Sequence, residues 1–81
     1  MTVYIVTKEV RYDGESDFDI KAFSNKAEAD AYFVQASSVY KRDATLDEWV
    51  IDEDTPTCFA AYEDGYECEN HYYFNIYEKE I

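Results

Sequence analysis

At 81 residues, the chain is long enough for one small domain, residues 1–81, and too short for a second. It carries 19 Asp and Glu against 7 Lys and Arg, and the resulting net charge of −12 at pH 7 argues against direct binding to nucleic acid or to an anionic membrane surface. Hydrophobic residues make up 47% and aromatic residues 19% of the chain, which argues against disorder because each buried ring adds roughly 150–250 Å² to a core.

The chain has no apolar run long enough to span a bilayer and no basic-then-apolar leader after Met1. We therefore expect a soluble, cytoplasmic protein that does not bind membranes. Two cysteines, Cys58 and Cys68, are too few for the disulfide framework of a secreted domain, so we expect both thiols to be reduced.

Two strands joined by a turn are expected first. Residues Thr2–Arg11 place apolar side chains on both faces, which is typical of a strand near the middle of a sheet. Asp13–Asp17 is polar and contains a glycine, as connections often do, and Phe18–Phe23 then alternates again. These segments predict a β-hairpin.

A helix is expected to begin at Ser24 or Asn25, since either side chain can accept a hydrogen bond from the free amides of the first turn. With Asn25 as the cap, Glu28 takes the third helical position and completes a capping box. Lys41-Arg42 would lie at the far end, where positive charge complements the helix dipole. Apolar residues at helical spacing predict the face that packs on the sheet: Ala29, Tyr32, Phe33, Ala36, Val39 and Tyr40.

Two short strands are expected after the helix. Asp47–Asp54 places the apolar centre Trp49-Val50-Ile51 between carboxylates and is ended by Thr55-Pro56. Thr57–Tyr62 is a second candidate, weakened by Ala60-Ala61 because alanine is depleted in strands.

The most regular pattern lies near the C-terminus and follows an acidic turn marked by Asp64-Gly65. From His71 onward two sets of residues alternate, which indicates a strand with one face buried. The sets are Tyr72, Phe74 and Ile76 on one face, and Tyr73, Asn75 and Tyr77 on the other. Hairpin, helix and further strands together predict an α+β domain, with one helix packed across one face of a mainly antiparallel sheet.

Neither a metal centre nor a catalytic centre is expected. Cys58, Cys68 and His71 are ligands that zinc prefers, but a structural site needs four, and a carboxylate such as Glu69 would have to complete the set. The acidic runs do not match a calcium-binding loop. His71 is the one histidine, and two glycines are too few for a phosphate-binding loop. We expect no enzymatic activity, no metal and no cofactor, with a zinc-dependent domain as an alternative.

The feature that remains is the combination of carboxylates with tyrosines. Carboxylates can occupy the positions of phosphates in a basic groove, and tyrosine gives a flat contact at low entropic cost. Duplex DNA carries one charge per about 1.7 Å of its axis, so twelve excess charges correspond to roughly 20 Å of duplex. A compact domain of this length has a radius of gyration of about 12 Å, so its charge density is comparable to that of the duplex. The candidate partner-binding residues are Asp52, Glu53, Asp54, Glu63, Asp64, Tyr66, Glu67 and Glu69.

The size, acidity and aromatic content of the chain suggest a resemblance to a class of proteins rather than to one protein. The segments that suggest it most are Tyr62–Glu69, Asp13–Asp19 and Asp47–Asp54. The chain resembles small anti-defence proteins of phages and mobile elements, such as anti-CRISPR and anti-restriction proteins that imitate DNA. Phe23–Ala29 also resembles the helix entry of small phage and bacterial proteins with a hairpin, helix and strand order. The resemblance implies a non-enzymatic inhibitor that occupies the basic groove of a nucleic-acid-binding protein.

An ordinary interaction module or a homodimer is the other hypothesis. In that case the last strand pairs edge to edge with another chain, and the carboxylates serve solubility.

Overall fold

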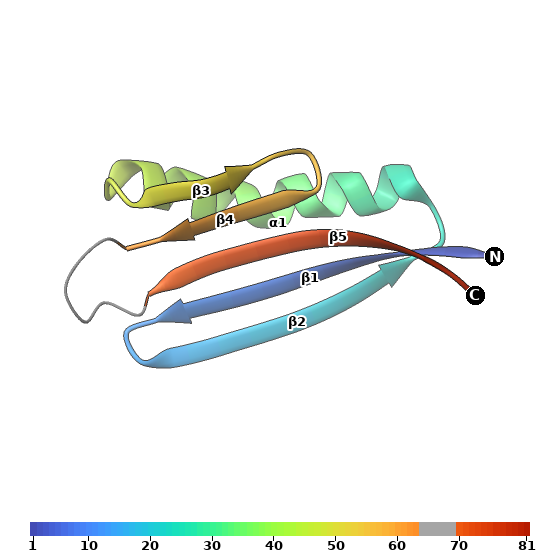
Figure 1. Ribbon diagram of the computed structural model, residues 1–81, viewed down its shortest axis with the longest axis horizontal. Helices are drawn as coiled ribbons and strands as arrows, with labels where there is room; N and C mark the ends of the chain where they lie inside the picture. The colour runs from blue at the N-terminus through green and yellow to red at the C-terminus, as the bar shows by residue number, and fades with distance from the viewer. Residues whose placement is uncertain (64–69) are drawn as a thin grey trace.

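The computed structural model describes residues 1–63 and 70–81 (Figure 1). Its elements are β1 (Thr2–Tyr12), β2 (Glu15–Phe23), α1 (Lys26–Leu46), β3 (Val50–Asp54), β4 (Cys58–Tyr62) and β5 (His71–Glu80). The strands form one sheet in the order β2-β1-β5-β4-β3, with every neighbouring pair antiparallel. Helix α1 packs against this sheet, which confirms the predicted α+β architecture.

The predicted hairpin is confirmed, with a connection shorter than expected. Only Asp13 and Gly14 form the turn, with φ angles of 53° and 81°, and Tyr12 pairs with Glu15 directly beyond it. Two consecutive residues with positive φ match the twist of a two-residue β-hairpin. Residues Glu15–Phe23 therefore all belong to β2.

Asn25 is the N-cap of α1, as predicted. Its side-chain oxygen accepts hydrogen bonds from the backbone amides of Ala27, at 2.8 Å, and Glu28, at 3.3 Å. This satisfies two of the amides that have no partner inside the helix.

The predicted C-terminal end of the helix is wrong. Lys41-Arg42 lies inside α1, which continues to Leu46 with Asp47 as its C-cap. The added turn contains no glycine or proline and is anchored by Ala44, which is fully buried in the core. Glu48, with φ of 58°, then reverses the chain.

The predicted packing face of α1 is right except at Val39, which is 49% exposed. Ser37 takes a buried place in that face and donates its hydroxyl to the carbonyl of Phe33 at 2.6 Å. A serine can be buried when its hydroxyl donates a hydrogen bond to a carbonyl of its own helix. A search for apolar residues does not find such a position.

Strand β3 begins later than predicted, because Asp47 caps the helix and Trp49 enters the core before the strand starts. Ala60 and Ala61 belong to β4 and are both buried. In β5 the predicted alternation holds except at Asn75, since Tyr72 and Phe74 are buried and Tyr73 and Tyr77 are exposed, whereas Asn75 is only 8% exposed.

The last strand is central, so the alternative hypothesis in which it pairs edge to edge with another chain is wrong. Strand β5 lies between β1 and β4, so the two edges are β2 and β3. Its central place comes from pairing with β1, which lies about 70 residues earlier in the chain, and local sequence patterns do not encode such long-range pairing.

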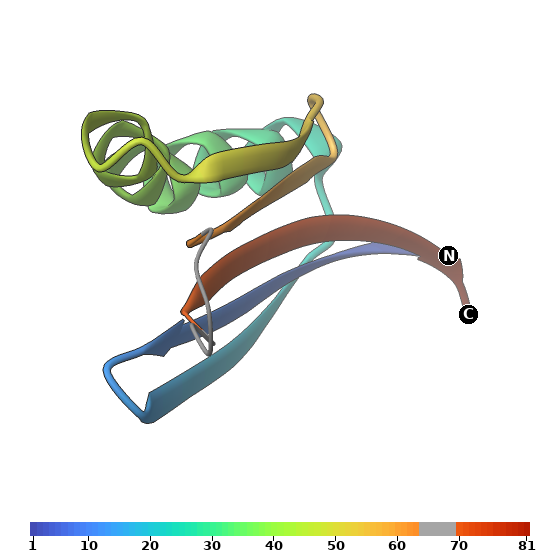
Figure 2. The ribbon, with the colours of Figure 1, turned by 60° about the vertical axis from the view of Figure 1, so that its left-hand side comes forward.

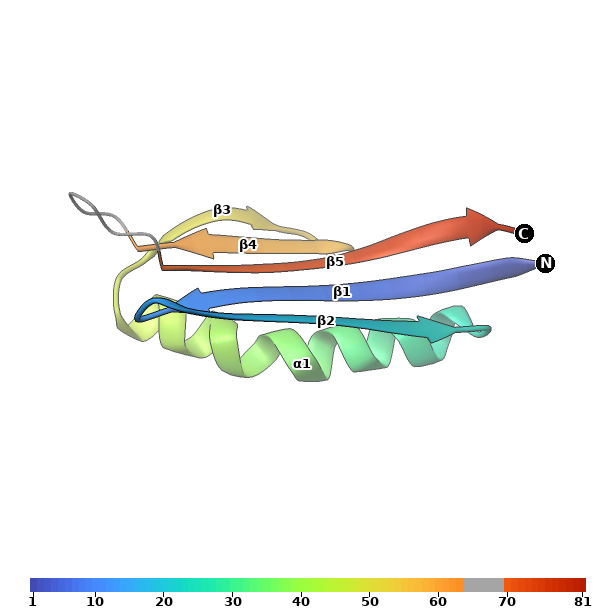
Figure 3. The same cartoon turned by 90° about the horizontal axis from the view of Figure 1, so that it is seen from below.

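The core lies between α1 and one face of the sheet, and the described chain supplies no second layer for the other face (Figure 3). The buried core residues are Val6, Val10, Ala29, Phe33, Ala44, Trp49, Phe59, Ala61, Tyr72 and Phe74. The molecule is elongated, with Cα extents of 45 × 20 × 16 Å. Both termini lie at one end, and the β1–β2 turn and the C-terminal end of α1 lie at the other, called here the turn end (Figure 1).

Candidate functional site: an acidic aromatic groove

Four aromatic residues from four parts of the chain meet at the turn end. The Trp49 indole stacks on the Tyr72 ring, with ring centroids 4.5 Å apart and planes at 26°. Tyr40 of α1 meets Tyr72 edge-on at 4.8 Å, and Tyr12 of β1 lies nearly parallel to Trp49 at 6.4 Å. These rings form a continuous aromatic floor.

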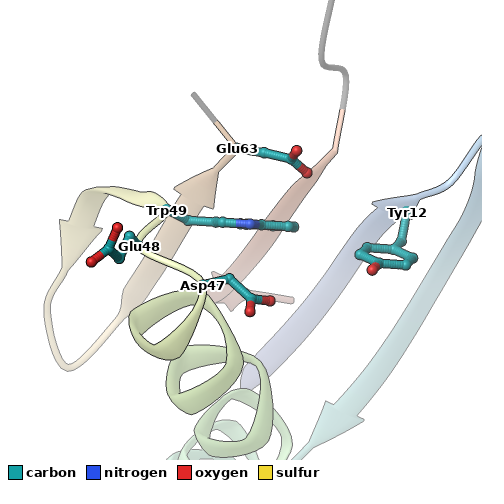
Figure 4. Close-up of a pocket in the computed structure, with 5 residues that line it drawn as sticks. All are labelled: Tyr12, Asp47, Glu48, Trp49 and Glu63. Carbon is teal, nitrogen blue, oxygen red and sulfur yellow. The ribbon is translucent and has the colours of Figure 1, made fainter. Parts of the chain in front are cut away.

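Carboxylates surround this floor. A pocket of about 380 Å³ is lined by Tyr12, Trp49, Asp47, Glu48 and Glu63, and Figure 4 shows Asp47 and Glu63 on either side of the Trp49 ring with Tyr12 across from it. Two adjoining pockets share Tyr12 and extend the hollow between α1 and the β1–β2 hairpin, which diverge at this end (Figure 2).

We call this hollow the acidic groove. Its floor is Tyr12, Tyr40, Trp49 and Tyr72, and its carboxylates are Glu15, Asp17, Asp43, Asp47, Glu48 and Glu63.

Local backbone interactions fix the groove's shape. The backbone amide of Trp49 donates to the carbonyl of Ala44 at 2.8 Å, which turns the indole back over the end of the helix. Asn70 links the β1–β2 turn to the end of β4. Its side-chain oxygen accepts a hydrogen bond from the Asp13 amide at 2.9 Å, and its side-chain nitrogen donates one to the Glu63 carboxylate at 2.8 Å. The hairpin turn and Glu63 are thereby held together.

The pKa shifts follow from burial and from this charge. Burial raises the pKa of the Tyr72 phenol, and the nearby Asp43 carboxylate raises it further. Burial alone lowers the pKa of Lys8, but hydrogen bonds to Asp17 and Tyr40 outweigh that effect and raise it overall. The Lys8 ammonium lies 3.1 Å from Asp17 and 5.3 Å from the centroid of the Tyr40 ring. The Lys8 ammonium thus already contacts a carboxylate and an aromatic ring of the groove, which are the contacts that a cationic group of a ligand would make.

The residues predicted from sequence do not form one patch. Glu63 lines the acidic groove, whereas Asp52, Glu53 and Asp54 lie on the edge strand β3. A register shift between Ile51 and Glu53 separates these three carboxylates, and Asp54 forms an ion pair with Lys41 of α1 at 2.8 Å. Asp64, Tyr66, Glu67 and Glu69 lie outside the described residues, as do Cys68 and the turn predicted at Asp64-Gly65.

Sequence reasoning missed Tyr12 and Trp49 as site residues because each reads as part of a strand. A usable signal was the distribution of charge: residues 47–69 contain nine of the 19 carboxylates and no lysine or arginine. The chain's excess negative charge is concentrated in this segment, which begins at the turn end.

The proposed zinc ligands do not come together. Cys58 pairs with Asn75 while His71 pairs with Tyr62, so the two ligands are four residues apart along the strands. That is about 13 Å, too far for one ion with ligands at about 2.0–2.3 Å. The structure, over the residues it describes, contains no group of three His, Cys, Asp or Glu side chains suited to a metal, and Cys58 is a free thiol.

Comparison with models of protein families, with curated protein sequences and with solved structures finds no match for this chain. Within residues 1–63 and 70–81, no helix is at once long enough and apolar enough to cross a membrane.

Proposed function

We propose that the protein is a non-enzymatic binding protein whose acidic groove receives basic side chains from the nucleic-acid-binding surface of a target protein. It thereby competes with DNA or RNA for that surface, in the manner of the anti-CRISPR and anti-restriction proteins that it resembles. The observation that carries the proposal is the convergence of six carboxylates from separate parts of the chain around the aromatic floor.

The chemistry of the groove suits lysine and, above all, arginine. A guanidinium can stack on an aromatic ring while its N–H groups donate to carboxylates, and the groove offers both kinds of contact within one pocket. The existing contact of Lys8 with Tyr40 and Asp17 is an internal example of the same recognition. No catalytic role is proposed, since His71 lies on the opposite face of the sheet.

The elongated shape changes the comparison with nucleic acid. Twelve excess charges over a length of 45 Å amount to roughly one per 4 Å, which is near the 3.4 Å spacing of one strand's phosphates and about half the density of a duplex. The match with duplex density expected from a compact shape therefore does not hold. A single strand's charge spacing is the closer parallel.

The test neutralises three groove carboxylates, in the variant Asp47→Asn, Glu48→Gln, Glu63→Gln. Its matched control neutralises Glu28, Asp30 and Glu78, which lie towards the terminal end, by the same kind of substitution. Tagged proteins capture partners from lysate of the source cells, and bound proteins are eluted with salt or with competing single-stranded DNA or RNA. We expect a nucleic-acid-binding protein that the wild type and the control retain and that the groove variant binds at least about tenfold more weakly.

Equal binding by the groove variant and the wild type contradicts the proposal. So does a partner whose elution responds neither to salt nor to nucleic acid.

A further inference from the structure

The sheet face opposite α1, called here the open face, is apolar over much of its area. Strand alternation directs the side chains of one set of residues away from the helix. Phe18 is 62% exposed, Ile20 56% and Tyr77 50%. The set comprises Val3, Ile5, Thr7, Glu9, Arg11, Ser16, Phe18, Ile20, Ala22, Val50, Asp52, Glu53, Cys58, Ala60, Tyr62, His71, Tyr73, Asn75, Tyr77 and Lys79.

The open face is also nearly free of net charge. Arg11 and Lys79 offset most of the charge of Glu9, Asp52 and Glu53, while the whole chain carries −12. Two copies of so acidic a chain repel each other through most of their surfaces. The open face is where a second copy meets least repulsion.

Asn75 lies at the centre of this face. The residue is only 8% exposed, and its side-chain nitrogen is enclosed by the chain's own atoms without a hydrogen-bond partner among the described residues. The exposed apolar side chains and the low net charge of this face are therefore what favour an occupant.

We propose that the open face is the interface of a homodimer in which two sheets pack face to face. About 40 strand residues, each covering some 16 Å² of sheet, give roughly 600 Å² per copy and 1,200–1,300 Å² in total. This reaches the lower end of the range for stable protein interfaces, about 1,200–2,000 Å². The proposal is independent of the acidic groove, which lies on the other side of the sheet.

The strand register makes the face complementary to itself. A twofold axis along the strands, between β1 and β5, places β2 of one copy over β4 of the other. Phe18 and Ala60 lie in one row across the sheet, so a large exposed ring falls over a small residue. Ala60 lies at the bottom of a hollow of about 300 Å³ between Tyr62 and Tyr73, and this hollow can accept the Phe18 ring of the second copy.

The next row repeats the pattern. Its members are Ile20, Thr7, Asn75 and Cys58. The same axis places Ile20 over the half-buried Cys58 and sets Thr7 of the second copy over Asn75. Large residues meet small ones, and the polar pair meets at the centre.

Sedimentation equilibrium from micromolar to millimolar concentration tests the proposal. We expect a dimer of twice the 9.5 kDa chain mass. Its association constant should rise with added salt, because salt screens the repulsion between the acidic copies. Phe18→Glu should weaken dimerisation by about a hundredfold or more. Val34→Glu is the matched control, since Val34 lies on the outer surface of α1 and is also 62% exposed.

Circular dichroism verifies that both variants are folded. A wild type that stays monomeric at millimolar concentration overturns the proposal. A dimer that Phe18→Glu leaves intact also overturns it, because an edge-to-edge pairing through β2 or β3 would behave in that way.

Cross-linking tests the register itself. In a Cys68→Ser background, Ile20→Cys places a thiol opposite Cys58 of the second copy, and a short bis-maleimide should join the two chains. Lys21→Cys is the control, since its neighbouring position on β2 faces the helix side of the sheet. Equal yields of cross-linked dimer from the two variants contradict the proposed arrangement.

Discussion

At the scale of single residues, Trp49 is the point where the core meets the groove. It is 8% exposed and stacks on Tyr72, yet its ring also lines the acidic groove. We expect Trp49→Ala to lower the free energy of unfolding by about 3–5 kcal/mol, since it leaves a cavity beneath the groove. Tyr12→Ala, at a residue 52% exposed, should cost less than about 1 kcal/mol. Urea denaturation measures both, and similar losses would mean that Trp49 is not a core residue.

Cys58 gives a second prediction at this scale. Burial and the nearby Glu53 carboxylate raise the pKa of its thiol above the ordinary value of 9.0. The thiolate is the form that reacts with iodoacetamide. At pH 8, iodoacetamide should therefore label Cys58 more slowly in the folded protein than in the unfolded chain, and the labelling rate of the folded protein should rise only at higher pH. A folded state with a raised thiol pKa also loses stability as the pH rises past 9.0 towards that pKa. Labelling of the Cys68→Ser variant, followed by mass spectrometry, measures the rate, and equal rates in the two states would contradict the shift.

At the scale of elements, the N-cap of α1 is the clearest case for a local test. Asn25 accepts two backbone amides of the first turn, so Asn25→Ala should reduce the free energy of unfolding by about 1 kcal/mol. Asn25→Asp keeps an acceptor oxygen and should lose little. Chemical denaturation followed by circular dichroism distinguishes the two, and equal losses would show that the cap is not what stabilises this end.

The elements themselves could largely be predicted from sequence, because their signals are local. Asp13-Gly14 encodes the turn, Asn25 encodes the start of the helix, and the alternation after His71 encodes β5. The end of α1 could not be predicted, since no breaking residue follows Arg42 and only the burial of Ala44 fixes the last turn. The central place of β5 depends on its pairing with β1, about 70 residues away.

The candidate site was less predictable for the same reason. Glu63 was identified from local charge, but the groove exists only because β1, α1 and β5 bring Tyr12, Tyr40 and Tyr72 together. The run Asp52–Asp54 has the same acidic composition and is divided by a shift in strand register that composition does not reveal.

At the scale of the whole molecule, concentrated negative charge should make folding sensitive to salt. The Debye length falls from about 30 Å at 0.01 M to about 3 Å at 1 M, so added NaCl screens repulsion along the 45 Å molecule. We expect the melting temperature to rise with NaCl, and to rise less in the variant Asp47→Asn, Glu48→Gln, Glu63→Gln. Thermal circular dichroism at fixed pH measures this. A melting temperature that falls with NaCl would show that attractive ion pairs outweigh the repulsion.

The meeting of the two termini has a practical consequence. The Met1 ammonium lies 2.8 Å from the Glu80 carboxylate, and the Ile81 amide donates to the Met1 carbonyl at 2.8 Å. A short peptide linker could therefore join the ends, and a circularly permuted chain could open at Asp13-Gly14 instead. A fusion attached at Met1 or Ile81 would project away from the turn end, whereas one attached at ends opened at Asp13-Gly14 would stand beside the acidic groove and obstruct it.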